Sequence, residues 1–173
     1  RSLARLASWF LVCGDPQYRL HAQDVATLAH QASLTQHVLR TPNLNRVLIA
    51  DEVGLGKTIE AGLILRELLA QQPGLRVLYL APARLVSNVR REFDRLQLSF
   101  RTWVAGTARD ATLSDPRVIA SIHRAAHPNH INTFTDTGSW DIIVIDECHH
   151  LSDWEPGGGS PVQKYRLADA LRG

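Results

Sequence analysis

A segment with the pattern of a phosphate-binding loop restricts the fold of this chain more than any other feature. Residues 51–59 read DEVGLGKTI, directly after an apolar run at 47–50 and at the start of a helix-compatible segment at about 57–71. A strand, a loop and a helix in this order let backbone N–H groups and the helix N-terminus surround a phosphate. The segment therefore predicts a nucleotide-binding α/β domain.

Each residue of this loop has an expected role. Gly54, Leu55 and Gly56 belong to the loop itself, and Gly56 lets the backbone approach the phosphates. Lys57 would neutralise charge on the β- and γ-phosphates, and the Thr58 hydroxyl would hold Mg²⁺. We therefore expect ATP and Mg²⁺ to bind at this loop.

An acidic string supplies the second half of the expected chemistry. Asp146 and Glu147 follow directly after the apolar run at 142–145. A buried parallel strand delivers the residues after it to the carboxyl edge of the sheet, where α/β proteins bind ligands. From there the Asp146 carboxylate would reach the Mg²⁺ shell, and Glu147 would orient and deprotonate the attacking water. Together the two strings predict ATP hydrolysis.

Composition is that of an ordinary soluble globular protein. The chain has 173 residues, of which 45% are hydrophobic and 21% charged, and a formal net charge of +2. Such a charge is compatible with nucleic acid but does not argue for it. The apolar stretches are too short for a membrane span, and the two cysteines are far apart in sequence. We expect a cytoplasmic protein without a structural disulfide or a membrane partner.

Alternating apolar runs and helical segments predict an α/β fold with a parallel sheet covered by helices on both faces. Strands are expected at 47–50, 77–81, 100–104, 117–121 and 141–145. Helices are expected at about 3–12, 21–40, 57–71, 84–97 and 161–171. We divide the chain into an N-terminal helical segment, 1–45, and an ATPase lobe, 46–173, which we expect to be truncated because no strand follows its last helix.

The motifs resemble those of one enzyme family. They comprise residues 51–62, a strand-to-helix junction with Pro82, Leu85 and Asn88, and the string at 146–151. In these segments the chain resembles the first RecA-like lobe of superfamily-two helicase-type ATPases, in the Swi/Snf-type branch and its bacterial RapA-type members. The resemblance implies a RecA-like P-loop NTPase fold and a DNA-dependent ATPase, with duplex DNA favoured.

The resemblance also implies further site residues. Gln23 resembles the glutamine that reads adenine, although Ala22 stands where these proteins usually carry an aromatic residue or histidine. His149 would couple the ATP site to the next motif. Arg84, on a helix, fits a solvated face as well as a phosphate contact. Four residues match the family's DNA-backbone contacts in position: Pro82, Arg84, Ser121 and His123.

The wider role follows from the same resemblance. Such proteins bind ATP between this lobe and a second RecA-like lobe of the same polypeptide, which supplies arginine fingers. The implied activity is ATP-driven translocation along duplex DNA without strand separation, in transcription or defence complexes at the bacterial nucleoid. An isolated first lobe is then expected to bind nucleotide weakly and to hydrolyse almost none.

Two other functions stay open. A strand-separating DNA or RNA helicase of superfamily two would share the same ATP-site residues. A catalytically silent nucleotide-binding interaction module would not need an intact set of Lys57, Thr58, Asp146 and Glu147. What separates these alternatives is the polynucleotide that stimulates turnover, and whether any turnover occurs.

Three histidines raise the question of a metal site. His123, His127 and His130 are spaced four and three residues apart, which on one helix would bring them together like zinc ligands. Pro128 interrupts that helix, and no cysteine or acidic residue completes the set. We therefore expect no metal at these histidines.

Overall fold

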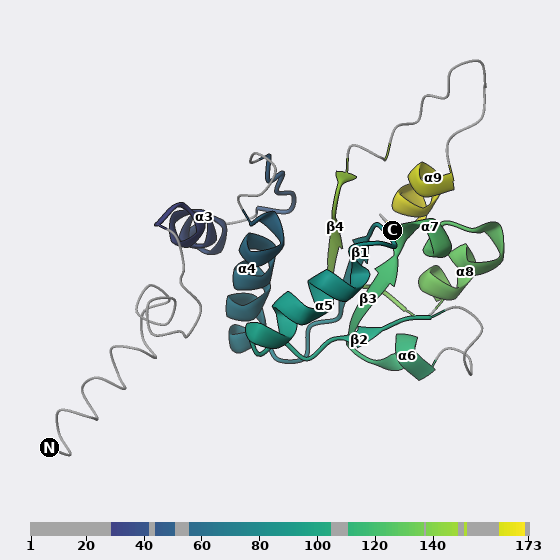
Figure 1. Cartoon of the computed structure of the whole chain (residues 1–173), viewed down its shortest axis with the longest axis horizontal. Helices are drawn as coiled ribbons and strands as arrows, with labels where there is room; N and C mark the ends of the chain where they lie inside the picture. The colour runs from purple at the N-terminus through teal and green to yellow at the C-terminus, as the bar shows by residue number, and fades with distance from the viewer. Residues whose placement is uncertain are drawn as a thin grey trace, which may run out of the picture. The chain divides into compact units, whose positions relative to one another are not determined.

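The chain divides into two compact units, Arg1–Pro73 and Gly74–Gly173. The computed structural model describes residues 29–41, 44–50, 56–104, 111–136, 138–148, 151 and 163–171 (Figure 1). This division differs from the boundary between residues 45 and 46 that the sequence suggested, which stays a prediction.

Among the described residues of the first unit, two helices pack against each other, α3 (Ala29–Arg40) and α4 (Lys57–Gln71). The predicted range of α4 is confirmed at both ends. Its central turns carry leucine, isoleucine and alanine, which favour helix and are buried here. α3 confirms the second half of the helix predicted at 21–40, whereas residues 3–12 and 21–28 lie outside the described part of the chain.

The strand predicted at 47–50 is wrong for this structure. Residues 44–50 form no regular secondary structure, and 44% of Val47 and 75% of Leu48 are exposed. A strand is stable only when its backbone N–H and C=O groups pair with a neighbour. Within the described residues no strand pairs with this run, so its apolar, β-compatible sequence is not sufficient to form one.

The second unit is built on a four-stranded sheet in the order β2-β3-β1-β4 (Figure 1). All three pairings are parallel, which confirms the α/β class expected from the sequence. Ala81 pairs with Ser121, and Leu80 pairs with Ile145, so the carboxyl ends of the three adjacent strands β3, β1 and β4 lie at one edge. The strands are β1 (Val77–Ala81), β2 (Arg101–Thr102), β3 (Arg117–Ser121) and β4 (Ile142–Ile145).

Helices cover both faces of this sheet, as expected. On one face α5 (Val86–Arg95) packs its Phe93 ring edge-on against Tyr79 of β1, with 5.1 Å between ring centroids. Leu78 and Leu80 point to the opposite face, because alternate residues of a strand do so. Three helices cover that face: α7 (Ile122–Ala125), α8 (Pro128–Asp136) and α9 (Gln163–Ala170). The core there contains Leu78, Leu80, Val118, Ala120, Ile122, Ala125, Phe134 and Leu167.

Three short helices were not expected from the sequence: α6 (Ala111–Ser114), α7 and α8. Pro128 is the first residue of α8, a position where its missing N–H costs no helical hydrogen bond. The proline that was expected to interrupt a helix therefore also begins one. α5 and α9 lie within their predicted ranges and are shorter at both ends. Across the described residues, no helix is long and apolar enough to cross a membrane.

Candidate functional site

The phosphate-loop helix begins as the sequence predicts. Gly56 caps α4 with a left-handed backbone, φ 89° and ψ 32°, a conformation that a residue with a side chain rarely adopts. Its carbonyl oxygen accepts hydrogen bonds from the N–H groups of Ile59 at 2.7 Å and Glu60 at 3.0 Å. Lys57 and Thr58 form the first turn and are half-buried. Gly54 and Leu55 lie outside the described residues.

A glutamine that the sequence reasoning did not select lies against this cap. Gln31 of α3 is only 3% exposed, and a Cβ added to Gly56 would come within 2.9 Å of its Nε2. The carbonyl of Gln31 accepts a hydrogen bond from the Thr35 hydroxyl at 2.8 Å. A signal for it was present in the sequence, because His30 precedes Gln31 in the histidine-glutamine order that Gln23 lacks. Gln23 itself lies outside the described residues.

The acidic pair lies at the end of β4. The N–H of Asp146 donates to the carbonyl of Leu80 at 2.8 Å, which extends the pairing with β1 one residue beyond the strand. The N–H of Glu147 then donates to Oδ1 of Asp146 at 2.9 Å. Glu147 has a positive φ of 53°, which is uncommon for a residue with a side chain. This sharp turn places two carboxylates in succession at the carboxyl edge of the sheet.

The residues expected to contact DNA gather at the same edge. Pro82 and Arg84 follow β1, while Ser121 ends β3 and His123 lies on α7 just beyond it. Pro82 and Ser121 are buried, whereas Arg84 and His123 are exposed. Of the four candidates, Arg84 and His123 are therefore the ones that present side chains to solvent.

The residues of the expected ATP site belong to two different units of the chain. Lys57 and Thr58 belong to the first unit, and Asp146 and Glu147 to the second. The Thr58 hydroxyl and the Asp146 carboxylate are hard oxygen donors of the kind that Mg²⁺ takes, so these residues fit the ion by their chemistry. That they form one site stays a prediction of the motifs, as does the coupling role of His149, which lies outside the described residues.

The three histidines do not share a helix. His123 lies on α7, which ends at Ala125, and His130 lies on α8, which begins at Pro128. The His130 ring packs edge-on against Trp103, with 5.3 Å between ring centroids. In the part of the chain that the structure describes, no group of three or more His, Cys, Asp or Glu residues could hold a metal ion.

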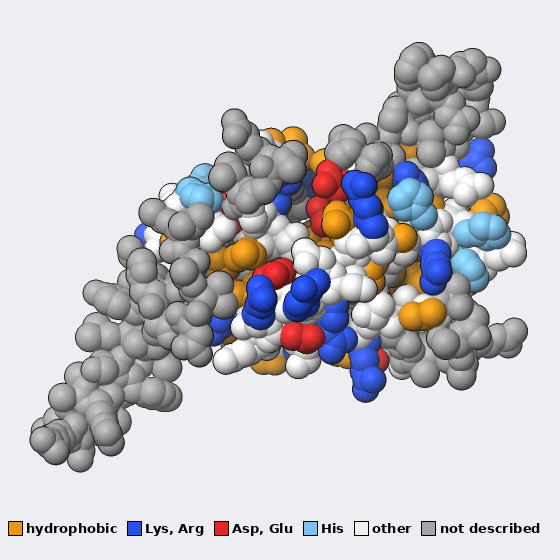
Figure 2. Space-filling view, viewed as in Figure 1, with side chains coloured by type: hydrophobic (Ala, Val, Ile, Leu, Met, Phe, Trp, Pro, Cys, Tyr) orange, Lys and Arg blue, Asp and Glu red, His pale blue; other side chains and the backbone are white. Residues whose placement is uncertain are grey.

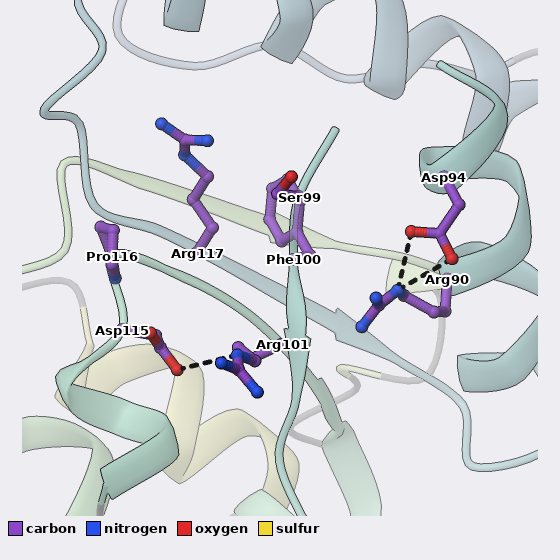
Figure 3. A pocket seen from close by; sticks show the side chains of 8 residues that line it. All are labelled: Arg90, Asp94, Ser99, Phe100, Arg101, Asp115, Pro116 and Arg117. Atoms are coloured by element: carbon purple, nitrogen blue, oxygen red, sulfur yellow. Dashed lines mark hydrogen bonds and ion pairs between the residues drawn. The ribbon is translucent and has the colours of Figure 1, made fainter. Parts of the chain in front are cut away.

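A cavity of about 410 Å³, lined mostly by charged residues, lies at the amino edge of the sheet (Figure 3). Arg101 and Arg117, which line it, are the first residues of β2 and β3. Arg101 forms an ion pair with Asp115 at 3.5 Å. A second ion pair, between Arg90 and Asp94 of α5, also lines the cavity (Figure 3). Because α/β proteins bind substrates at the opposite edge, we do not assign the nucleotide to this cavity.

The charges of α5 are mixed rather than uniformly basic. On the face shown in Figure 2, basic and acidic side chains are interspersed. Arg90 pairs with Asp94 at 3.0 Å, and Arg95 pairs with Glu92 at 3.0 Å, both within the helix. These pairs are typical of a solvated helix face and leave Arg84, in the turn that precedes the helix, as the better candidate for a phosphate contact.

Two comparisons with known proteins bear on this arrangement. The family model described as "Type III restriction enzyme, res subunit" matches residues 23–167. The chain is also 33% identical over 150 residues to the RNA polymerase-associated protein RapA of Stutzerimonas stutzeri (strain A1501). That alignment covers 83% of this chain and 15% of the relative, so the chain spans a small part of the length of RapA.

Proposed function

Because the chain belongs to the type III restriction enzyme res subunit family, a family of helicase-like superfamily-two ATPases, we propose that it is the ATP-binding lobe of a DNA-dependent motor. Its hydrolysis of ATP would drive translocation on duplex DNA or remodelling of complexes on it. The observation that supports this most is the agreement of both motifs with their structural context. α4 starts at Lys57 after a left-handed glycine, and the acidic pair follows β4 at the carboxyl edge.

The proposed roles follow the chemistry of phosphoryl transfer, in which positioning and charge stabilisation dominate. Lys57 would neutralise charge on the β- and γ-phosphates, and Thr58 and Asp146 would hold Mg²⁺, which would neutralise further negative charge on the phosphate oxygens. The Glu147 carboxylate orients the attacking water and accepts its proton. These roles use oxygen and nitrogen donors of four residues and require no covalent intermediate.

Gln31 is the better candidate for reading adenine. Its amide is a donor and an acceptor on one planar group, which matches the donor N6 and the acceptor N7 of adenine. It lies against Gly56, the residue before Lys57, and His30 precedes it in sequence. We therefore propose Gln31 for the role first given to Gln23.

The partners of this motor are proposed from the relatives. Arg84 and His123 would contact the phosphates of a duplex at the carboxyl edge, and His149 would couple that contact to the ATP site. The name of RapA states that it associates with RNA polymerase, which makes a transcription complex the first partner to test. A defence complex on foreign DNA is the second. Either partner places the protein at the bacterial nucleoid.

ATP hydrolysis by the full-length protein tests this proposal. Turnover is measured with duplex DNA, single-stranded DNA or RNA added, for the native protein and for Lys57→Ala and Glu147→Gln. We expect duplex DNA to stimulate turnover most, and both substitutions to abolish the stimulation. Stronger stimulation by single strands or RNA would favour a strand-separating helicase. An absence of turnover with every polynucleotide would favour a silent interaction module.

A further inference from the structure

A buried carboxylate on α4 has no part in the roles described so far. Glu60 is fully buried in the first turn of the helix, and its Oε1 lies 3.5 Å from Nε2 of His30 on α3. Burial of a carboxylate is unfavourable unless it is paired or hydrogen-bonded. The position of Glu60 therefore calls for a reason beyond filling space between two helices.

The contacts around Glu60 form a closed circuit. Its backbone N–H donates to the carbonyl of Gly56 at 3.0 Å, and its side chain pairs with His30. His30 precedes Gln31, whose Nε2 lies where a Cβ of Gly56 would collide with it. The steps are a backbone hydrogen bond, a histidine–carboxylate pair, a peptide bond and the close approach of the Gln31 amide to Gly56. The circuit joins the first turn of α3 to the phosphate-loop end of α4.

We propose that Glu60 and His30 are positioning residues that hold the Gln31 amide against Gly56, and so set the affinity and base preference of the nucleotide site. Glu60 acts through His30 and touches no nucleotide itself. Without this pair, the first turn of α3 would lose a polar attachment to α4, and the Gln31 amide would be held less firmly in one orientation. This inference rests on the proposed role of Gln31 in reading adenine.

Two residues of the same types, further along the same helices, allow the positioning role to be distinguished from a purely stabilising one. Glu67 is also buried on α4, at 1% exposure, but lies seven residues further from the loop. His37 lies seven residues beyond His30 on α3 and is exposed. Each functional candidate thus has a matched control of the same residue type on the same helix. A purely structural role for buried charge would affect Glu60 and Glu67 alike.

The test compares equilibrium binding of fluorescent ATP and GTP analogues to the full-length protein. We expect Glu60→Gln and His30→Ala each to weaken ATP binding by about tenfold, with a smaller effect on GTP, so that preference for adenine falls. Gln31→Ala should have the same effect. The double variant Gln31→Ala with Glu60→Gln should be no weaker than Gln31→Ala alone, because both changes remove one interaction. Glu67→Gln and His37→Ala should keep the native preference.

Several results would overturn the proposal. The first is that Glu60→Gln and Glu67→Gln prefer ATP over GTP equally, while Gln31→Ala loses this preference. The second is that the losses of ATP binding free energy in Gln31→Ala and Glu60→Gln add fully in the double variant. If Glu60→Gln does not fold, His30→Ala carries the test, because 45% of the His30 side chain is exposed and its removal perturbs the core less. Unchanged ATP binding in Lys57→Ala would instead contradict the proposed function itself.

Discussion

At the scale of single residues, the backbone of Glu147 is the most informative feature of the acidic pair. Its φ of 53° is a conformation that costs a residue with a side chain about 1–2 kcal/mol. Gln97, with φ 59°, is the other residue in this class among the described residues that are not glycine. Gln97 ends a helix, where such a backbone is common, whereas Glu147 ends a strand beside Asp146. The strain at Glu147 therefore supports a functional role.

Replacing Glu147 with asparagine separates the effect of its carboxylate on turnover from the effect of its backbone conformation on stability. Asparagine tolerates a positive φ, so Glu147→Asn should leave stability unchanged or raise it by up to about 1 kcal/mol. The same change removes the carboxylate and should lower DNA-stimulated turnover at least about 100-fold. Urea unfolding and single-turnover hydrolysis measure the two effects. Gln97→Asn is the control, with similar backbone geometry and no expected loss of turnover; equal turnover in both variants would contradict the assignment.

Arg84 tests the DNA surface at the same scale. If Arg84 contacts a phosphate, Arg84→Ala should weaken duplex binding similarly for all sequences and reduce the slope of log K against log salt by about 1. Arg95→Ala is the matched control, because Arg95 is exposed at the far end of α5 and pairs with Glu92. A salt titration of duplex binding measures both. Identical slopes in the two variants would remove Arg84 from the interface.

At the scale of elements, the C-terminal end of α5 is a helix terminus that lacks the usual glycine. The N–H of Leu98 donates to the carbonyl of Phe93 at 2.8 Å, and that of Gln97 to the carbonyl of Asp94 at 3.1 Å. This pair of bonds is a Schellman motif, in which the residue with positive φ is most often glycine. Leu98 is 5% exposed and Phe93 is fully buried, so the two positions that make an apolar contact in this motif are both apolar and buried here.

Gln97→Gly should therefore stabilise the second unit. Glycine relieves the positive φ but gives the unfolded chain more freedom, so we expect a net gain of about 0.5 kcal/mol. Thermal or urea unfolding measures the change. Gln97→Ala is the control and should not stabilise, because alanine shares the steric cost of a Cβ. A loss of stability in Gln97→Gly would show that the side chain makes a contact stronger than this backbone effect.

Arg76 joins several segments of the chain at the amino edge of the sheet. Arg76 precedes β1, and its guanidinium donates to the carbonyls of Ser139 and Leu113, each at 3.2 Å. It also lies 4.6 Å from the ring centroid of Trp140, and its backbone N–H donates to the Asp141 carboxylate at 2.7 Å. These contacts join β1, the segment that enters β4 and α6. No local pattern around Arg76 predicted them.

Arg76→Lys should destabilise the second unit by about 1–2 kcal/mol. Lysine keeps the charge but cannot donate to two carbonyls in fixed directions while lying over an indole ring. Arg101→Lys is the control, since Arg101 is exposed and its ion pair with Asp115 is at the surface. Urea unfolding followed by tryptophan fluorescence measures both changes. Equal stability of the two variants would mean that the Arg76 side chain does not hold these segments.

At the scale of the whole molecule, the similarity to RapA and the family match confirm the family resemblance drawn from the motifs. The parallel sheet with helices on both faces agrees with a RecA-like lobe. The motifs of ATP chemistry fall in two units, with Lys57 in one and Asp146 in the other. Turnover therefore depends on more than the local geometry of either motif.

The 173-residue chain by itself should show little turnover. In related phosphoryl transfer, an arginine finger from a second lobe or partner raises the rate by about 10³ to 10⁵. We expect the chain alone to bind ATP weakly and its hydrolysis to be near background, with or without DNA. Comparing it with the full-length protein at equal ATP concentration measures the difference. Robust turnover by the chain alone would show that no second lobe is needed.

The sequence by itself determined the parallel α/β class, the strands β1, β3 and β4 and the start of α4, because these depend on apolar periodicity and on glycine and lysine at fixed positions. It also indicated the acidic pair, whose role depends on its place after a strand. Tertiary structure alone decided three other features. Residues 47–50 form no strand because pairing requires a neighbour, and Pro128 begins a helix whose Phe134 belongs to the buried core. Gln31, which the His30–Gln31 order marks in the sequence, lies close to Gly56 only in the folded unit. Each depends on contacts between residues distant in the chain, which local sequence patterns do not encode.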